Sequence, residues 1–305
     1  MSPGVGGCAV ATHALERDYG GGAGVFDVDL RVPEGGAFGL VGLNGAGKTT
    51  LLMLLSGMRT PGKGRIEHSY ARSSIAVCPD VPEFEPWLTA AEVVASAAGL
   101  AGIRPAPEEV STLVERVGMS AAADRRTRGF SRGMKQRLGM AAALIQRPRL
   151  LILDEPAAGL DPQGRADVLD LVSALRGETT MVFSSHLLTD VQRVCDDVAV
   201  LRAGRLVYQG AVDELLAQHV RPSWELRVRG RAAAEVRELL AAEPWVVSAE
   251  EAGGDTVVVD ADSVPSGETG IPALLVREGI ALTSMVPCDA RLEAAFMSLT
   301  QEEAT

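Results

Sequence analysis

Along the first 220 residues, the spacing of apolar positions alternates several times between a pattern typical of strands and one typical of helices. Short apolar runs favour buried strands, and four such runs lie at 37–41, 75–78, 150–153 and 180–184. Residues 48–58, which follow the first run, have apolar positions at helical spacing. Strands that alternate with helices predict an α/β fold.

The segments between these runs predict a strand, a hairpin and a helical insert. Residues 25–32 alternate and end at Pro33-Glu34-Gly35-Gly36, which predicts one strand and a turn. Residues 198–209 contain Ala203-Gly204 between two apolar runs, which predicts a hairpin. Residues 89–145 carry several helical patterns with prolines between two of them, so we expect an all-helical insert.

The composition shifts near Val220-Arg221-Pro222. The patterns beyond this point predict four strands and three helices, at 224–228, 246–249, 256–259 and 281–286 and at 232–242, 273–278 and 291–299. We therefore expect two domains, with residues 1–220 as the larger one and residues 221–305 as a small α+β domain.

The charge of the chain restricts its partners. Its 305 residues include 40 acidic and 29 basic side chains, for a formal net charge of −11. Non-specific binding to nucleic acid depends on Lys and Arg that neutralise phosphates, so we expect no nucleic-acid partner. Six basic side chains do cluster within residues 125–137. We interpret them as a solvated surface or as an attraction for a nucleotide, with nucleic-acid contact as the alternative.

The spacing of the cysteines and the length of the apolar segments bear on the cellular compartment of the chain. The four cysteines, Cys8, Cys78, Cys195 and Cys288, are too widely spaced in sequence for a C-x-x-C pair, which fits a reducing environment. The longest uncharged apolar stretch of note, 93–103, is shorter than the roughly 20 residues of a membrane span. We expect neither a signal peptide nor a transmembrane segment.

Residues 42–49 match the phosphate-loop pattern G-x-x-x-x-G-K-[ST] and lie between a predicted strand and a predicted helix. Glycines let successive N–H groups point at phosphate oxygens, and the helix N-terminus adds positive charge. Lys48, one of only three lysines among many arginines, supplies a compact point charge for the β and γ phosphates. The hydroxyl of Thr49 is placed to bind Mg²⁺. The predicted nucleotide-binding residues are Gly42, Leu43, Asn44, Gly45, Ala46, Gly47, Lys48, Thr49 and Thr50.

A second candidate site follows the apolar run 150–153, which ends in Asp154 and Glu155. Unpaired carboxylates at the end of a buried strand are costly unless they have a use. We expect Asp154 to hold Mg²⁺ and Glu155 to orient or deprotonate the attacking water; Lys48 is a further catalytic candidate.

Further segments resemble one family of nucleotide hydrolases, the ATP-binding cassette (ABC) ATPases. Residues 130–137, which read FSRGMKQR, resemble their signature motif; residues 158–161 (AGLD) resemble their D-loop; and Ser184-Ser185-His186 resembles their switch histidine. The resemblance covers about residues 1–220. It implies a P-loop NTPase cassette with a RecA-like core sheet, an antiparallel β subdomain and a helical subdomain at about 84–147.

The resemblance also implies roles for individual residues and a dimer. Ser131, which is placed to cap a helix, and Gly133 would face the nucleotide of a second copy, and Asp161 would lie at that interface. His186 would contact the γ-phosphate of ATP. Tyr19 would stack on adenine, although an ordinary packing role is the alternative. The implied assembly is a head-to-tail homodimer.

Three residues depart from the family pattern. Asp80 stands where the family usually has Gln; a carboxylate binds Mg²⁺ or its water but donates no hydrogen bond when ionised. Met134 replaces the Gln of the signature motif and removes a polar contact. Arg132 replaces its first Gly, and either adds charge near phosphate or points into solvent.

The resemblance favours the ATP-binding subunit of a bacterial exporter that works with a separately encoded membrane permease, on the cytoplasmic face of the membrane. The segment 81–88 is rich in Pro and aromatic residues, and Phe84 and Trp87 would line a permease-docking groove or simply anchor a loop. Residues 291–300 resemble a tail of exporter subunits. The C-terminal domain would support dimerisation or regulate it. A non-transport ABC ATPase acting as a regulator or assembly motor is the alternative.

Overall fold

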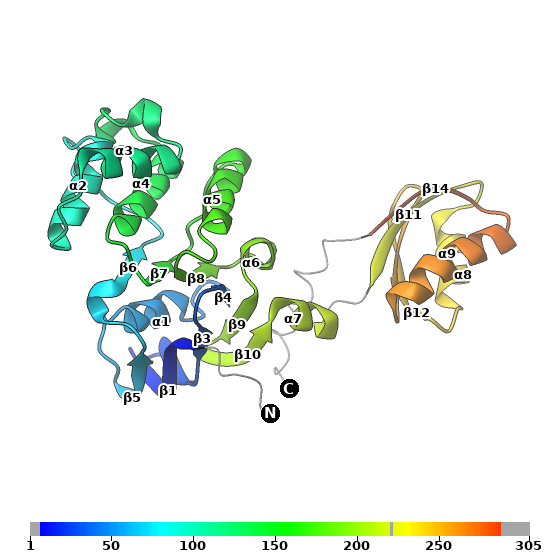
Figure 1. Ribbon diagram of the computed structural model, residues 1–305. Coiled ribbons are helices and arrows are strands. Elements are labelled where there is room, and N and C mark those ends of the chain that lie inside the picture. Colours follow the sequence, from blue (N-terminus) through cyan, green and yellow to red (C-terminus); the bar gives the residue numbers. More distant parts are fainter. Residues whose placement is uncertain (1–6, 220–221, 288–305) are drawn as a thin grey trace. The chain divides into compact units, whose positions relative to one another are not determined.

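The computed structural model describes residues 7–219 and 222–287 (Figure 1). The chain divides into two compact units, Met1–Val212 and Asp213–Thr305. The division falls at the start of helix α7 (Val212–His219), a few residues before the boundary expected at 220.

A six-stranded sheet forms the centre of the first unit. Its strand order is β10-β9-β4-β8-β7-β6, and all neighbours are parallel except β10, which forms the expected hairpin with β9. The strands are β4 (Ala37–Val41), β6 (Ile75–Cys78), β7 (Leu150–Leu153), β8 (Thr180–Ser185), β9 (Asp197–Arg202) and β10 (Arg205–Ala211). Every residue of β4, β7 and β8 is buried, which is why these strands read as continuous apolar runs. The predicted α/β fold is confirmed.

A four-stranded antiparallel sheet lies beside this core. The long strand β1 (Cys8–Asp18) pairs with β2 (Gly24–Val28), β3 (Arg31–Pro33) and β5 (Lys63–His68). The prediction of one strand over 25–32 was wrong. The chain breaks between β2 and β3, where Leu30 N donates to Thr12 Oγ1 and the Asp29 carboxylate accepts from Ala14 N, so the two halves pair with different parts of β1.

The helices of the first unit form two groups, one that follows strands of the core sheet and one that forms a separate insert. Helix α1 (Lys48–Leu55) follows β4, while α5 (Pro162–Ala174) and α6 (Leu188–Val194) follow β7 and β8. Figure 1 shows α2 (Ala90–Leu100), α3 (Pro107–Arg116) and α4 (Arg132–Leu144) grouped apart from β1 and β5. These three helices form the all-helical insert. Thr89 begins it with a capping box that it shares with Glu92.

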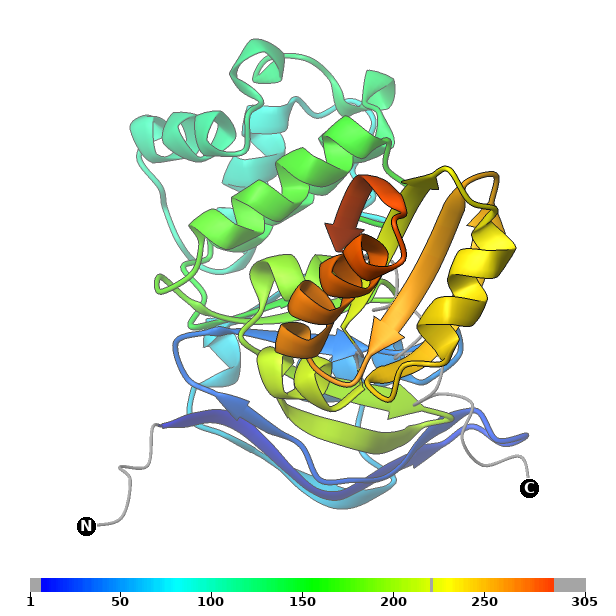
Figure 2. The ribbon, with the colours of Figure 1, turned by 90° about the vertical axis from the view of Figure 1, so that its right-hand side faces the viewer.

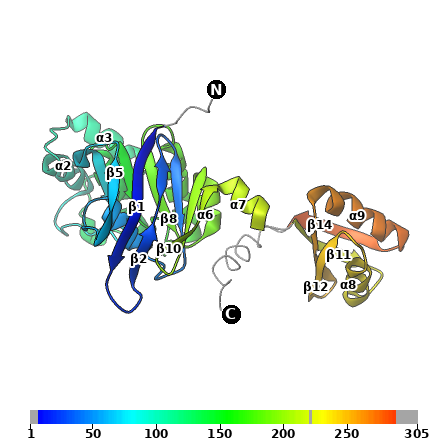
Figure 3. The ribbon, with the colours of Figure 1, turned by 90° about the horizontal axis from the view of Figure 1, so that it is seen from below.

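The second unit is an α+β sandwich. After α7, its elements are β11 (Ser223–Arg229), α8 (Ala233–Ala241), β12 (Val246–Gly253), β13 (Thr256–Ala261), α9 (Val264–Arg277) and β14 (Ala281–Pro287). The antiparallel sheet has the order β12-β13-β11-β14, which is the βαββαβ, ferredoxin-like arrangement. Figures 2 and 3 show both helices on one face of this sheet. They cover a core that contains Trp224, Leu226 and Leu274. The predicted helix at 291–299, the exporter-like tail and Cys288 lie outside the described residues.

The state of the cysteines and the apolar length of the helices can be compared with the expectations from composition within the described residues. Cys8, Cys78 and Cys195 are free thiols, and burial raises the pKa of the Cys78 thiol to about 12. In residues 7–219 and 222–287, no helix has the length and apolar character that crossing a membrane requires.

Candidate active site

A cavity of about 370 Å³, here called the loop cavity, lies at the carboxyl edge of the core sheet. It is lined by Tyr19, Ala23, Gly24, Asn44, Gly45, Ala46, Gly47, Lys48, Thr49, Thr50, Asp80 and Glu155. These residues come from the end of β1, the β4–α1 loop, the start of α1 and the ends of β6 and β7. The fold thus joins most of the predicted nucleotide and metal residues around one space.

The β4–α1 loop has a backbone shape that only glycine permits at two positions. A Cβ atom on Gly47, whose φ is +100°, would lie 2.7 Å from the carbonyl oxygen of Gly24. A Cβ on Gly42 would lie 2.7 Å from the carbonyl oxygen of Leu201. Gly45 also has positive φ but faces open space. The loop is therefore a cradle of exposed backbone at the N-terminus of α1, where the first N–H groups have no intrahelical partner.

Lys48 lies at the floor of this cradle and is 6% exposed. Its ammonium donates to the carbonyl oxygen of Gly42 at 2.6 Å and lies 3.4 Å from that of Leu43. It also pairs with Glu155, Oε1 lying 3.1 Å from Nζ. Gly42 and Leu43 therefore contribute carbonyl groups that orient Lys48, while the cavity itself begins at Asn44.

Glu155 contacts both Lys48 and His186, one through each carboxylate oxygen. Its second oxygen lies 2.7 Å from His186 Nδ1, and the backbone N–H of His186 donates to the same oxygen. Oε1 is buried and has no hydrogen bond, because the nearby Lys48 approaches it without hydrogen-bond geometry. The φ of Glu155 is +46°, a conformation that non-glycine residues adopt at a cost of about 1–3 kcal/mol. The surroundings therefore hold Glu155 in a strained backbone conformation, with one carboxylate oxygen that accepts no hydrogen bond.

Ser184 positions both predicted acidic residues, although no role for its side chain was predicted from the sequence. Its hydroxyl donates to Asp154 Oδ1 at 2.7 Å and accepts from the backbone N–H of Glu155 at 2.8 Å. Ser184 is fully buried and lies on β8, next to β7. The motif Ser184-Ser185-His186 was visible in the sequence, but strand pairing is needed to place the first serine against Asp154.

The cavity fits a nucleoside triphosphate with its metal. The cradle offers backbone N–H groups for phosphate oxygens, and the metal candidates Thr49, Asp80 and Asp154 all offer oxygen atoms, as Mg²⁺ prefers. Thr49 and Asp80 line the cavity, whereas Asp154 is not among its lining residues, is 7% exposed and accepts a hydrogen bond from Ser184. Among the described residues, no three His, Cys, Asp or Glu side chains converge on a metal position.

Tyr19 lies at the rim of the loop cavity and is 48% exposed. The Arg17 guanidinium lies over its ring, 5.3 Å from the centroid. One face of the ring is thus taken by a cation, and an exposed aromatic surface remains at the rim for a flat group.

The signature residues line a different space. A cavity of about 370 Å³, the signature cavity, is lined by Ser131, Arg132, Gly133, Arg137, Gly159, Leu160, Asp161, Gln163, Gly164 and Asp167. Ser131 caps α4 by accepting from Met134 N, as predicted, and Asp161 caps α5 by accepting from Gly164 N. Ser131, Gly133 and Asp161 therefore do not join Lys48 and Glu155 within one copy of the chain.

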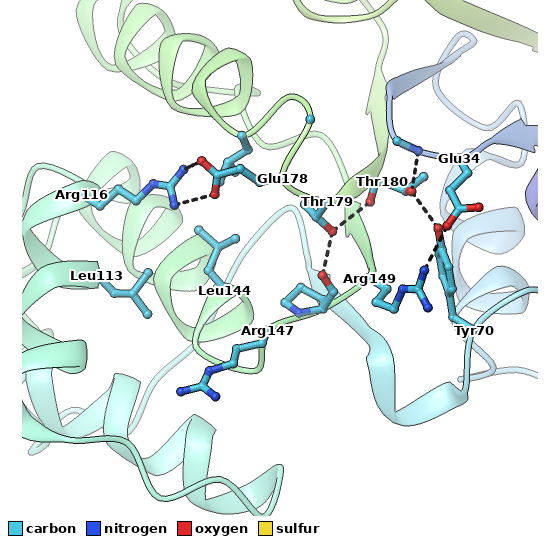
Figure 4. Close-up of a pocket in the computed structure, with 14 residues that line it drawn as sticks. Glu34, Tyr70, Leu113, Arg116, Leu144, Arg147, Arg149, Glu178, Thr179 and Thr180 are labelled. Carbon is cyan, nitrogen blue, oxygen red and sulfur yellow. Dashed lines mark hydrogen bonds and ion pairs between the residues drawn. The ribbon is translucent and has the colours of Figure 1, made fainter. Parts of the chain in front are cut away.

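A further cavity of about 440 Å³ lies at the opposite, amino end of β7 and β8 (Figure 4). Its arginines already have acidic partners: Arg116 forms a bidentate pair with Glu178, and Arg149 pairs with Glu34 while lying over the Tyr70 ring. The hydroxyl of Thr179 donates to the carbonyl of Pro148. Since these polar groups already have hydrogen-bond or ion-pair partners in the protein, we interpret this cavity as a gap where the helical insert packs against the core.

Known proteins resemble both units. Residues 25–158 match the family model described as ABC transporter. An uncharacterized ABC transporter ATP-binding protein of Bacillus subtilis, YxlF, is 32% identical over 95% of this chain and 99% of its own length. The daunorubicin/doxorubicin resistance ATP-binding protein DrrA of Streptomyces peucetius is 30% identical over 96% of this chain and 92% of its own. A solved structure of the ATP-binding subunit of an ABC transporter matches 69% of this chain and 92% of its own, at 28% identity and a TM-score of 0.62.

Proposed function

The chain belongs to the ABC transporter family and is an ATPase of that family, and we propose that it is the Mg²⁺- and ATP-dependent motor subunit of an exporter. The observation that carries this proposal is the loop cavity, where the glycine cradle, Lys48 and Glu155 meet. The export direction is supported by DrrA, whose similarity extends through the second unit as well as the cassette.

The residues around the loop cavity divide the work of hydrolysis. The cradle and Lys48 bind the β and γ phosphates, and Tyr19 receives the adenine ring. Thr49, Asp154 and Asp80 would hold Mg²⁺, which when bound would supply positive charge to the phosphate oxygens. Once phosphate attracts Lys48, Oε1 of Glu155 accepts a hydrogen bond from the attacking water. His186 keeps the other oxygen of Glu155 in place and reaches toward the γ-phosphate.

The separation of the two cavities supports a homodimer. Ser131, Gly133 and Asp161 border a second cavity that has no phosphate loop of its own. A second copy, arranged head to tail, would bring its loop cavity against this surface and complete both sites. The second unit is proposed to support this dimer or to regulate it.

The test of ATP hydrolysis uses two variants with different expected failures. Glu155→Gln should bind ATP but stall as a dimer, measured by size exclusion with Mg²⁺ and ATP. Lys48→Ala should lose ATP binding and stay monomeric. Undiminished turnover in Glu155→Gln would show that another group activates water.

The proposed permease-docking surface lies on the helical insert. Trp87, 62% exposed, lines a cavity of about 400 Å³ with Pro86, Arg126, Arg128 and Gly129. Phe84, the other predicted docking residue, is half-buried and does not line this cavity. Trp87 therefore carries the docking proposal, since a large exposed aromatic ring is typical of an interface.

Docking is tested by co-expression with a candidate permease, a polytopic membrane protein encoded separately from this chain. The chain should sediment with membranes only when that protein is present, and Trp87→Ala should reduce the amount sedimented. Leu100→Ala is the matched control, because Leu100 is 92% exposed on the same insert but does not line the cavity. A chain that stays in the supernatant would favour the alternative, a non-transport ATPase.

A further inference from the structure

Two of the residues that depart from the family pattern contact each other. Arg132 donates from Nη2 to Oδ1 of Asp80 at 2.6 Å, although 52 positions separate them in sequence. Asp80 lines the loop cavity, and Arg132, the first residue of α4, lines the signature cavity. One ion pair therefore connects the proposed nucleotide site to the surface that a second copy would approach.

We propose that Arg132 is a positioning residue that holds the Asp80 carboxylate away from the metal of a bound nucleotide. The inference rests on the proposed function, because it assumes that Mg²⁺ and ATP enter the loop cavity. Binding of the metal to Asp80 then requires the ion pair to open.

The physical basis is competition between two cations for one carboxylate. The Arg132 guanidinium occupies Oδ1 of Asp80 through a short charge-assisted hydrogen bond. Its positive charge also repels a divalent ion that approaches Oδ2. Arg132 is confined on its other side by Gly159, where a Cβ would lie 3.0 Å from the guanidinium carbon. The guanidinium thus lies between the D-loop and Asp80.

The position of Asp80 does not depend on Arg132 alone. The buried Gln136 donates to the carbonyl of Pro79 at 3.3 Å, directly before Asp80. Farther along α4, Gly139 packs so closely that an added Cβ would lie 2.7 Å from Pro82. Because these contacts hold residues 79–82 against α4, loss of Arg132 removes charge from Asp80 while leaving its carboxylate at the cavity edge.

The arrangement couples the two cavities. When the metal takes Asp80, the guanidinium of Arg132 is released at the start of α4, beside Ser131 and Gly133. A cation released there attracts the phosphates of a nucleotide held by a second copy. Occupancy of one cavity thereby prepares the other.

The experiment measures ATP affinity with Mg²⁺ and with EDTA, using the full chain in a Glu155→Gln background that prevents hydrolysis, diluted until size exclusion shows only monomer. The quantity compared is the ratio of the Kd in EDTA to the Kd in Mg²⁺. Arg132→Gln should raise this ratio about two- to fivefold, the range of a half-exposed ion pair. Arg132→Lys, which keeps the charge, should keep the ratio near that of the parent.

A double-mutant cycle separates this role from a general structural effect. With Asp80→Asn already present, Arg132→Gln should leave the ratio unchanged, because the carboxylate is gone. The inference is overturned if Arg132→Gln leaves or lowers the ratio in the parent, or raises it equally with Asp80→Asn. If the parent itself bound no ATP under either condition, the proposed function would fail first.

Discussion

Ser184 offers a sharp test of how the acidic residues are held. Ser184→Ala removes the hydroxyl that donates to Asp154 and accepts from the backbone N–H of Glu155. A hydrogen bond to a charged group contributes about 1.5–3 kcal/mol, and a buried N–H without an acceptor costs about 1–3 kcal/mol. We therefore expect the variant to lose roughly 3 kcal/mol of unfolding free energy.

The larger effect should be on turnover. Asp154 and Glu155 would lose the group that fixes their relative positions, and a misplacement of about 1 Å at a reacting centre can cost about 100-fold in rate. The assay is phosphate release with Mg²⁺ and ATP, at a temperature where urea denaturation shows the variant to be folded.

Thr179→Val is the matched control. Thr179 is buried next to the first residue of β8, at the end of the strand far from Ser184, and donates to the carbonyl of Pro148. Its loss should destabilise the fold by about 1–3 kcal/mol with little change in turnover per folded molecule. If Ser184→Ala kept the parent's turnover and Mg²⁺ requirement, the positioning role of Ser184 would be refuted.

Three glycine substitutions test the packing that the structure implies. Gly47→Ala should lower ATP affinity by more than about tenfold, because its Cβ would meet the carbonyl of Gly24, whereas Gly45→Ala faces open space and should cost only about 1–2 kcal/mol of backbone strain; equal affinities, measured by titration with ATP, would contradict this. Gly267→Ala would place a Cβ 2.1 Å from the Trp224 ring and should destabilise the second unit by about 1–3 kcal/mol. Tryptophan fluorescence during denaturation would detect the change, and an unaltered midpoint would count against the packing.

The parts of the site that lie close together in sequence were predictable. The phosphate loop and the Asp154-Glu155 pair each follow one apolar strand, so their residue types and spacing were enough to predict their place at the sheet edge. Ser184 was missed because its role depends on β8 lying beside β7, which the sequence does not specify. The break between β2 and β3 was missed for a related reason: the alternating pattern continues through it, while the hydrogen bonds that cause it come from β1.

The Arg132–Asp80 pair shows why departures from a motif are better judged together than singly. In sequence, Asp80 is a lost amide and Arg132 is an extra charge, and neither change explains the other. In the structure, the cation of one neutralises the anion of the other at the edge of the loop cavity.

Neutralisation by a neighbouring cation extends to the whole edge of the loop cavity, where carboxylates line the space that a negatively charged triphosphate would enter. Glu155 is neutralised by Lys48 and supported by His186, and Asp80 is neutralised by Arg132. An entering triphosphate attracts Lys48 away from Glu155, which leaves two acidic groups near phosphate with less compensation. On the proposed function, a divalent cation would offset that repulsion. Tight binding of ATP should therefore depend on Mg²⁺, and on the inference above the strength of that dependence should follow how firmly Arg132 holds Asp80.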